Sequence, residues 1–278
     1  MTDVQIHRHT MVAPDGTELA VVDYLLPRAQ AKGGVVLMHG LGEHSGRYTP
    51  IARFFNEQGL SVRSYDLRGH GRSGGARGDV PNGTPLLVDA ELLIDDFARQ
   101  LDQPPFLFGH SMGGLFATQF ALSRRSPLRG LMLSSPALAV DLSALQRRLL
   151  GLMLRLAPWF GVPNGLRPEF LSHDANVVRA YRQDPLVHNK ISARLLQSML
   201  QAIEVCQAQA GTLSLPCCLI VAGDDHLVNP AGAQRFFAGL QQGMAEMHVY
   251  ESCYHEVFNE PEAPSAFDDL ARWLQQRL

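Results

Sequence analysis

The sequence contains no run of about 18 consecutive apolar residues, the length that a membrane-spanning helix needs. Its opening stretch, MTDVQIHRHTMVAPDG, also lacks the apolar segment of a signal peptide. Its cysteines form no C-x-x-C pair, and Cys217 and Cys218 fall inside an apolar run, which predicts buried free thiols. From these absences we expect a cytoplasmic protein whose contact with a membrane is at most peripheral.

Clusters of basic residues are absent as well. The formal net charge is −3 and both signs are interspersed, whereas phosphate binding needs clustered Lys and Arg. His39, His44 and His70 fall near predicted loops, but no spacing such as H-E-x-x-H supports a set of metal ligands. We therefore expect no nucleic-acid partner, no metal and no cofactor, and we expect these histidines to form hydrogen bonds between loops.

What the sequence does contain is an alternation of short apolar runs and helical patterns. Hydrophobic residues make up 46% of the chain, enough for one large core. Two runs flanking Pro14-Asp15-Gly16 predict an antiparallel hairpin. Later runs predict strands buried in a parallel sheet, and they lie at 33–40, 60–67, 104–111, 128–136, 216–223 and 246–252. The predicted fold class is α/β, a mostly parallel doubly wound sheet with ligand sites at the carboxyl ends of its strands.

A G-x-S-x-G motif, Gly109-His110-Ser111-Met112-Gly113, stands between a predicted strand and a predicted helix. That context is typical of the nucleophile elbow of α/β-hydrolases, where a sharp turn exposes the serine hydroxyl at the edge of the sheet. Glycines two residues on either side relieve the crowding between strand and helix. The alternative is that Ser111 caps the helix. We interpret Ser111 as a catalytic nucleophile.

A serine nucleophile needs a base and an acid, which in this fold follow it in the order acid, then histidine. His255 comes just after the last predicted strand, where a loop can place its imidazole over Ser111. The acid is expected after the preceding strand, where Asp224 and Asp225 are adjacent, and Asp141 follows an earlier strand. Spacing alone does not choose among the three aspartates.

The oxyanion of an acyl-transfer reaction needs two preorganised N–H donors. Met38-His39-Gly40-Leu41-Gly42 follows the first parallel strand, and its glycines let the backbone approach a substrate. The backbone amides of Leu41 and Met112 are therefore the predicted oxyanion hole.

Several segments together resemble the monoacylglycerol lipase and lysophospholipase group of α/β-hydrolases over nearly the whole chain. They are HGLGEHSGRY (39–48), DLRGHGRSGG (66–75), GHSMGG (109–114), DPLVHNKISARL (184–195), GDDHLVNP (223–230) and YHEVFNE (254–260). The resemblance implies that Asp225 is the acid, because it precedes the valine of D-x-L-V by three residues. It also implies that Glu43 and Arg47 shape a polar, alcohol-binding end of the pocket; otherwise Glu43 caps a helix and Arg47 lies on its surface. Leu41 stands where related chains often carry a small residue.

Residues 137–204 interrupt the alternation of strands and helices, which predicts a cap inserted into a core formed by 1–136 and 205–278. One helical stripe in the cap is apolar, comprising Leu142, Leu145, Leu149, Leu152, Met153 and Leu156. This helix packs on the core or forms a lid that lines an acyl tunnel and transiently contacts membranes or micelles, and different faces of it can do both.

The resulting hypothesis is a cofactor-free serine esterase that cleaves single-chain lipid esters, above all monoacylglycerol, through an acyl-enzyme. A lysophospholipase and a broad carboxylesterase are the alternatives within the same chemistry, and an acyltransferase would use an alcohol in place of water. A non-catalytic lipid-binding scaffold is the alternative from another class. Ser111 at the elbow argues against haloalkane dehalogenases and epoxide hydrolases, which need an aspartate there.

Overall fold

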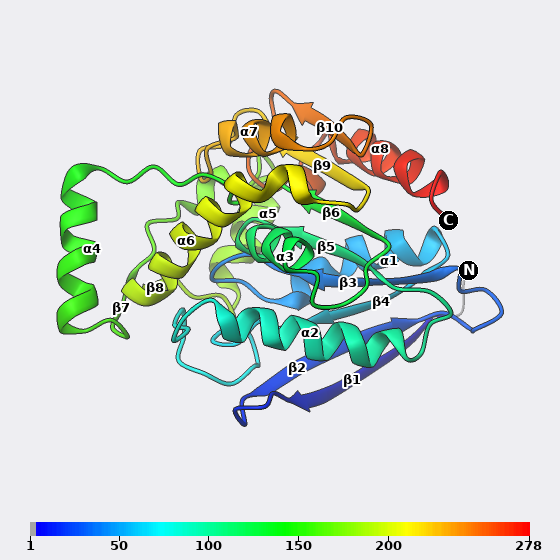
Figure 1. Cartoon of the computed structure of the whole chain (residues 1–278), viewed down its shortest axis with the longest axis horizontal. Helices are drawn as coiled ribbons and strands as arrows, with labels where there is room; N and C mark the ends of the chain where they lie inside the picture. Colours follow the sequence, from blue (N-terminus) through cyan, green and yellow to red (C-terminus); the bar gives the residue numbers. More distant parts are fainter. Residues whose placement is uncertain (1–3) are drawn as a thin grey trace.

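The computed structural model describes residues 4–278, and an eight-stranded sheet runs through the centre of that part of the chain (Figure 1). Its strands are β1 (Gln5–Val12), β2 (Glu18–Leu25), β3 (Gly33–Met38), β4 (Leu60–Tyr65), β5 (Phe106–His110), β6 (Gly130–Ser134), β9 (Cys217–Ala222) and β10 (Ala245–Tyr250). Their order across the sheet is β1-β2-β4-β3-β5-β6-β9-β10. The β1–β2 and β2–β4 pairs are antiparallel and the other pairs are parallel, which confirms the predicted fold class.

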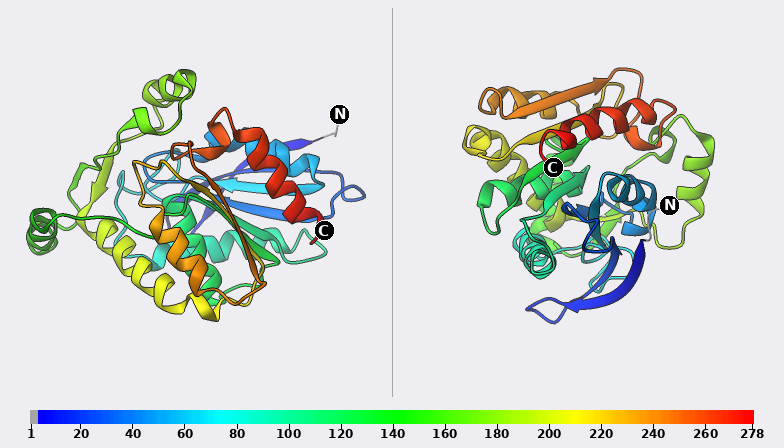
Figure 2. Two further views of the ribbon diagram at one scale, coloured as in Figure 1. Left: turned by 90° about the horizontal axis from the view of Figure 1, so that it is seen from above. Right: turned by 90° about the vertical axis from the view of Figure 1, so that its right-hand side faces the viewer.

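Helices cover both faces of the sheet, as the view from above in Figure 2 shows. One face carries α1 (Thr49–Glu57) and α8 (Ala263–Gln275), which bury Phe55 and Trp273 against the strands. The other face carries α2 (Thr84–Ala98), α3 (Met112–Ser123), α6 (Ala193–Gln209) and α7 (Ala231–Gly239). The central strands are buried along their whole length because both faces are covered, and they are nearly all apolar for that reason.

The segment between β6 and β9 differs from this regular pattern. It contains α4 (Ala144–Leu156), a small sheet of β7 (Gly161–Pro163) and β8 (Lys190–Ser192), the short helix η2 (Pro168–Phe170), and α5 (Ala175–Gln183). Helix α4 stands away from the body at the left of Figure 1 and buries none of its residues. Its first turn is closed by a capping box between Ser143 and Gln146. Helix α6 runs across position 204 and packs on α3 in the main core.

The parallel strands direct their carboxyl ends toward one edge of the sheet. The loops that carry the candidate residues follow β3, β5, β9 and β10 at this edge. Because β3, β5, β6 and β9 are neighbours, residues far apart in the sequence meet there.

Candidate active site

Ser111 occupies a strained turn between β5 and α3. Its backbone has φ 53° and ψ −121°, a region that residues with a side chain rarely adopt. Two hydrogen bonds fix the turn to the end of β6 and the loop that follows it. The Ser111 amide donates to the Ser134 carbonyl (3.0 Å), and the Ala137 amide donates to the Ser111 carbonyl (3.0 Å). A Cβ at Gly113 would overlap the carbonyl oxygens of Met38 and His39, so this glycine is required by the close approach of two backbones.

His255 and Asp225 meet beside this turn. The Nδ1 atom of His255 lies 2.7 Å from Oδ2 of Asp225, and both side chains are almost fully buried. The other oxygen, Oδ1 of Asp225, accepts from the amides of Leu227 and Val228 (both 2.9 Å). Burial acts to raise the pKa of Asp225, but His255 and these hydrogen bonds outweigh it and lower that pKa. An ionised carboxylate only accepts hydrogen bonds, so Nδ1 is the donor and Nε2 of His255 is left free to accept a proton.

The other candidate aspartates lie elsewhere. Asp224 is half exposed and its Oδ1 lies 3.1 Å from Nε2 of His226. Asp141 accepts a hydrogen bond from Asn229 (2.8 Å). In the part of the chain that the structure describes, Asp225 is the one of the three that contacts His255.

The His255 loop is fixed over the elbow by several contacts. The His255 ring lies beside the ring of His110, with 4.7 Å between centroids, and His110 directly precedes Ser111. The amides of His255 and Glu256 donate to the carbonyls of Phe170 (3.3 Å) and Leu171 (2.8 Å). Burial acts to lower the pKa of His255, but Asp225 and then the nearby glutamates Glu256 and Glu43 raise it above 6.5. Burial lowers the pKa of His110 to about 4, so this neighbour is uncharged at neutral pH.

The loop after β3 lies against the serine. A Cβ built on Gly40 would be 3.3 Å from Cβ of Ser111, which places the next residue, Leu41, at the nucleophile. Leu41 is partly exposed and Met112 is buried. Among residues 4–278 neither of their backbone amides donates a hydrogen bond to the protein. Two N–H groups beside the serine are thus available to a ligand oxygen.

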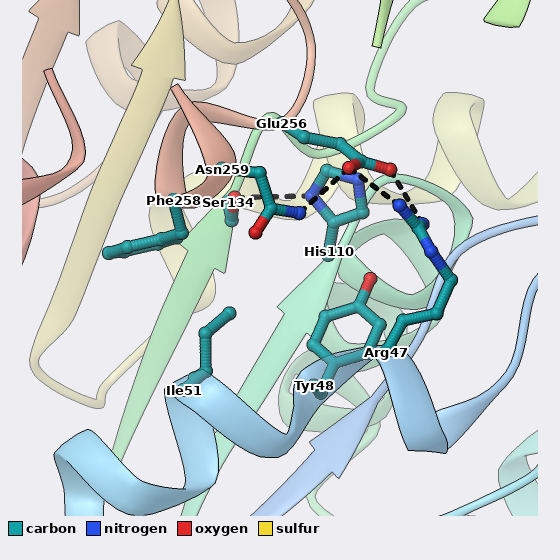
Figure 3. Close-up of a pocket in the computed structure, with 8 residues that line it drawn as sticks. All are labelled: Arg47, Tyr48, Ile51, His110, Ser134, Glu256, Phe258 and Asn259. Atoms are coloured by element: carbon teal, nitrogen blue, oxygen red, sulfur yellow. Dashed lines mark hydrogen bonds and ion pairs between the residues drawn. The ribbon is translucent and has the colours of Figure 1, made fainter. Parts of the chain in front are cut away.

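Glu43 and Arg47 both bond to the protein itself, and Figure 3 shows the Arg47 side chain directed toward Glu256. Oε1 of Glu43 accepts from the Gly40 amide (2.7 Å) and from the hydroxyl of Tyr48 (2.5 Å), and Oε2 accepts from Arg47. The guanidinium of Arg47 also donates two hydrogen bonds to Glu256 (2.7 and 2.8 Å). Whether Glu43 or Arg47 also contacts an alcohol stays a prediction.

Sequence reasoning missed Glu256 as a member of this arrangement. It follows His255 directly, and a second carboxylate beside the candidate base was the available signal. Tyr181 in α5 was missed as well, although its ring covers the Arg47 guanidinium at 4.8 Å. No sequence pattern distinguishes this buried tyrosine from any other apolar position of an amphipathic helix.

His39 and His44 form hydrogen bonds between loops, as predicted, whereas Nδ1 of His70 bonds within its own loop to the Arg68 carbonyl (3.0 Å). Nε2 of His39 accepts from the Leu67 amide (2.9 Å), and Nε2 of His44 lies 2.8 Å from Asp184. Within residues 4–278, no group of three or more His, Cys, Asp and Glu side chains is arranged to hold a metal ion. The same residues include no helix with the length and apolar character needed to cross a membrane.

The chain is similar to several known proteins. A family model described as "Serine aminopeptidase, S33" matches residues 29–262. A monoacylglycerol lipase of Mycolicibacterium smegmatis is 34% identical, over 97% of each chain. Phospholipase YtpA of Bacillus subtilis is 33% identical, over 88% of this chain and 95% of its own. An abhydrolase domain-containing protein of Dictyostelium discoideum is 34% identical over 91% of this chain, which spans 27% of that protein's length.

A solved structure extends this similarity to three dimensions. The monoacylglycerol lipase of Paleococcus ferrophilus superposes with a TM-score of 0.84 and 31% identity, over 99% of this chain and all of that one. Fold and elbow define the molecule as an α/β-hydrolase. The chain belongs to the serine aminopeptidase S33 family and, within it, to the serine hydrolases of the monoacylglycerol lipase group.

Proposed function

We propose that this protein hydrolyses carboxylic esters of single-chain lipids, with monoacylglycerol as its main substrate. The observation that carries the proposal is the hydrogen bond between His255 and Asp225 (2.7 Å) beside the strained Ser111 turn. This arrangement supplies a nucleophile, a base with one free nitrogen and an orienting carboxylate.

In the proposed reaction, Nε2 of His255 takes the hydroxyl proton while Oγ of Ser111 attacks the ester carbonyl carbon. The amides of Leu41 and Met112 bind the oxyanion that forms. The imidazolium then gives its proton to the alcohol oxygen, the carbon–oxygen bond breaks, and the alcohol leaves an acyl-serine. His255 next takes a proton from water, whose oxygen attacks the acyl carbon. Return of that proton to Oγ releases the fatty acid and restores Ser111.

The substrate class is supported by helix α4 and by the relatives. Large apolar side chains of α4 and of the loop after it are half exposed or more, including Leu145, Leu156, Trp159 and Phe160. Burying such side chains in a lipid phase is favourable by up to ~2 kcal/mol each. We propose that residues 137–204 form a cap whose α4 contacts a micelle or membrane and admits the acyl chain. Two similar proteins are named monoacylglycerol lipases.

Lysophospholipid is the second candidate substrate, because of a groove beside the His255 loop. This groove of about 570 Å³ is lined by Tyr254 and by His173, Arg179 and Arg182. These basic side chains suit a phosphate group, although Glu169 in the same wall pairs with Arg182 (3.1 Å). One relative carries the name phospholipase.

The test compares monooleoylglycerol, lysophosphatidylcholine and a chain-length series of p-nitrophenyl esters, with Ser111→Ala as the control. Fastest cleavage of monooleoylglycerol, with an inactive control, is the expected result. A preference for lysophosphatidylcholine would favour the second substrate. Cleavage of none of these esters would contradict the hydrolase proposal and favour a lipid-binding scaffold. If acyl transfer occurs only when an alcohol is added, the protein is an acyltransferase instead.

A further inference from the structure

The loop that carries the predicted oxyanion-hole amide and the loop that carries His255 are joined by three buried, ion-paired side chains. Glu43 lies in the loop that carries the Leu41 amide, and Glu256 follows His255. Arg47 lies between these glutamates and bonds to both of them. The exposed fractions of the three side chains are 4% for Glu43, 12% for Arg47 and 6% for Glu256. We call Glu43, Arg47 and Glu256 the clamp.

We propose that the clamp is a positioning device that fixes the oxyanion loop relative to the His255 loop, and so acts in both halves of the reaction. This proposal rests on the proposed ester-hydrolase function. On the oxyanion side, Glu43 accepts from the Gly40 amide (2.7 Å) and thereby fixes the His39–Gly40 peptide, which directly precedes the peptide that carries the Leu41 amide. On the base side, Glu256 is bound by Arg47 and also by the side-chain amide of Asn259 (2.8 Å).

The surroundings of Arg47 favour positioning over alcohol binding. Its hydrogen bonds go to carboxylates, and the ring of Tyr181 covers the guanidinium at 4.8 Å. The cavity that Arg47 and Glu256 line together holds about 20 Å³. That volume suits about one water molecule, and a glycerol moiety is several times larger. The two hydrogen bonds between Arg47 and Glu256 also fix the relative orientation of these side chains, which a contact between two point charges would not do.

The clamp has an electrostatic consequence as well. Two carboxylates and one guanidinium leave a net negative charge next to the base, which stabilises the imidazolium formed during catalysis. The charged groups with the largest effects on His255 are Asp225, Glu256 and Glu43; the His110 ring lies beside it, and Arg47 bonds to both glutamates. Removal of the Glu256 charge is therefore expected to shift the acid limb of the pH–rate profile to lower pH.

Deacylation separates positioning from alcohol binding, because the alcohol has left before water attacks the acyl-enzyme. The experiment measures burst kinetics with p-nitrophenyl butyrate and steady-state cleavage of monobutyrin for Glu256→Gln, Arg47→Ala and Arg47→Lys. Glu91→Gln on α2, which removes one partner of a partly exposed ion pair with Arg125, is the matched control. Thermal unfolding shows whether each variant is folded, and active-site titration of Ser111 gives the fraction of each variant that reacts.

We expect Arg47→Ala and Glu256→Gln to slow deacylation by about tenfold to a hundredfold, because small displacements of reacting groups have effects of this size. Arg47→Lys should deacylate faster than Arg47→Ala, since lysine keeps the positive charge but cannot form the bidentate hydrogen bonds of a guanidinium. It also carries the test if Glu256→Gln does not fold. Slower cleavage of monobutyrin with unchanged deacylation would overturn the proposal in favour of alcohol binding. Unchanged rates for both esters would overturn it outright.

The proposed function can fail separately from the clamp. If the wild-type protein forms no acyl-enzyme with either ester, the hydrolase proposal fails. The clamp is then judged by the pKa of the His255 ring, followed by NMR titration. Glu256→Gln should lower this pKa and Glu91→Gln should not. An unchanged value in Glu256→Gln would contradict the clamp.

Discussion

The candidate active site and helix α4 are built on opposite principles. Around Ser111, the polar side chains are buried and bonded in pairs, as with Asp225 and His255 or Glu43 and Arg47. In α4 no residue is buried, and Leu149 and Leu152 are about half exposed. The difference teaches that the proposed chemistry depends on preorganised contacts within the core, whereas the proposed lipid contact of α4 depends on a partner outside the chain.

This contrast has an energetic reason. A buried charge without its partner is expensive, so the site tolerates little change at either member of a pair. Exposed leucines cost the folded protein little, but each forgoes up to ~2 kcal/mol of burial. A lipid surface can supply that burial. Substitutions in the site should therefore affect every ester alike, and substitutions in α4 should affect long-chain, aggregated esters selectively.

The largest effect is expected for Ser111→Ala, which removes the proposed nucleophile. Turnover should fall by a factor on the order of 10⁶, with an unchanged circular dichroism spectrum. Ser123→Ala is the matched control at the far end of α3, where this hydroxyl bonds to the Phe120 carbonyl, and it should retain activity. Ester cleavage that survives Ser111→Ala at the wild-type rate would show that another residue attacks the substrate.

Asp225→Asn should have the next largest effect, about 10⁴-fold on kcat for every ester. The amide cannot stabilise the imidazolium and favours the wrong tautomer of His255. Asp224→Asn is a control from the adjacent position, and its exposed contact with His226 predicts a change below about twofold. Equal losses in the two variants, or a larger loss in Asp224→Asn, would contradict the geometry described for the acid.

The double substitution Leu149→Glu and Leu152→Glu tests the other region. Cleavage of emulsified monooleoylglycerol should fall roughly tenfold, because ~1.4 kcal/mol of lost lipid contact already gives that factor. Hydrolysis of soluble p-nitrophenyl acetate should not change, and the free energy of unfolding should shift by no more than about 0.5 kcal/mol per site.

Ile6→Glu serves as its control, since this side chain is also apolar and exposed (46%) but lies on β1. Shortening residues 142–160 should produce the same selectivity for long chains. Equal losses on short and long esters would remove the reason for assigning α4 a role with lipids.

The smallest expected effect is a displacement of the pH profile. The carboxylates around His255 raise its pKa above the ordinary 6.5, and the base must be neutral to accept the serine proton. Activity should therefore be lost as the pH falls through this raised pKa, so the midpoint of the acid limb of kcat/KM should lie above pH 6.5. A midpoint below that value would mean that burial outweighs the carboxylates at His255.

Much of the fold could be predicted from the sequence because its signals are local. The short apolar runs at 33–40 and 216–223 form β3 and β9, and the G-x-S-x-G motif stands between a strand and a helix. The final strand and the buried free thiols of Cys217 and Cys218 were also predicted correctly.

The partners of Glu43 and Arg47 could not be predicted in the same way. Arg47 and Glu256 are separated by 209 positions, and they meet because the sheet brings the ends of distant strands together. The choice between Asp224 and Asp225 likewise depends on the direction of side chains in one loop. The two possibilities for α4, packing on the core or forming a lid, differ only in tertiary contacts, and the structure shows that none of its residues is buried.

The most direct test of the central proposal is to locate the acyl group during turnover. The protein would be mixed with p-nitrophenyl butyrate, quenched in acid within the burst phase, digested and analysed by mass spectrometry. We predict a butyryl group on the peptide that contains Ser111, absent from Ser111→Ala and accumulating in proportion to the burst. A butyryl group on another residue, or turnover with a burst but no modified Ser111, would contradict the proposed mechanism.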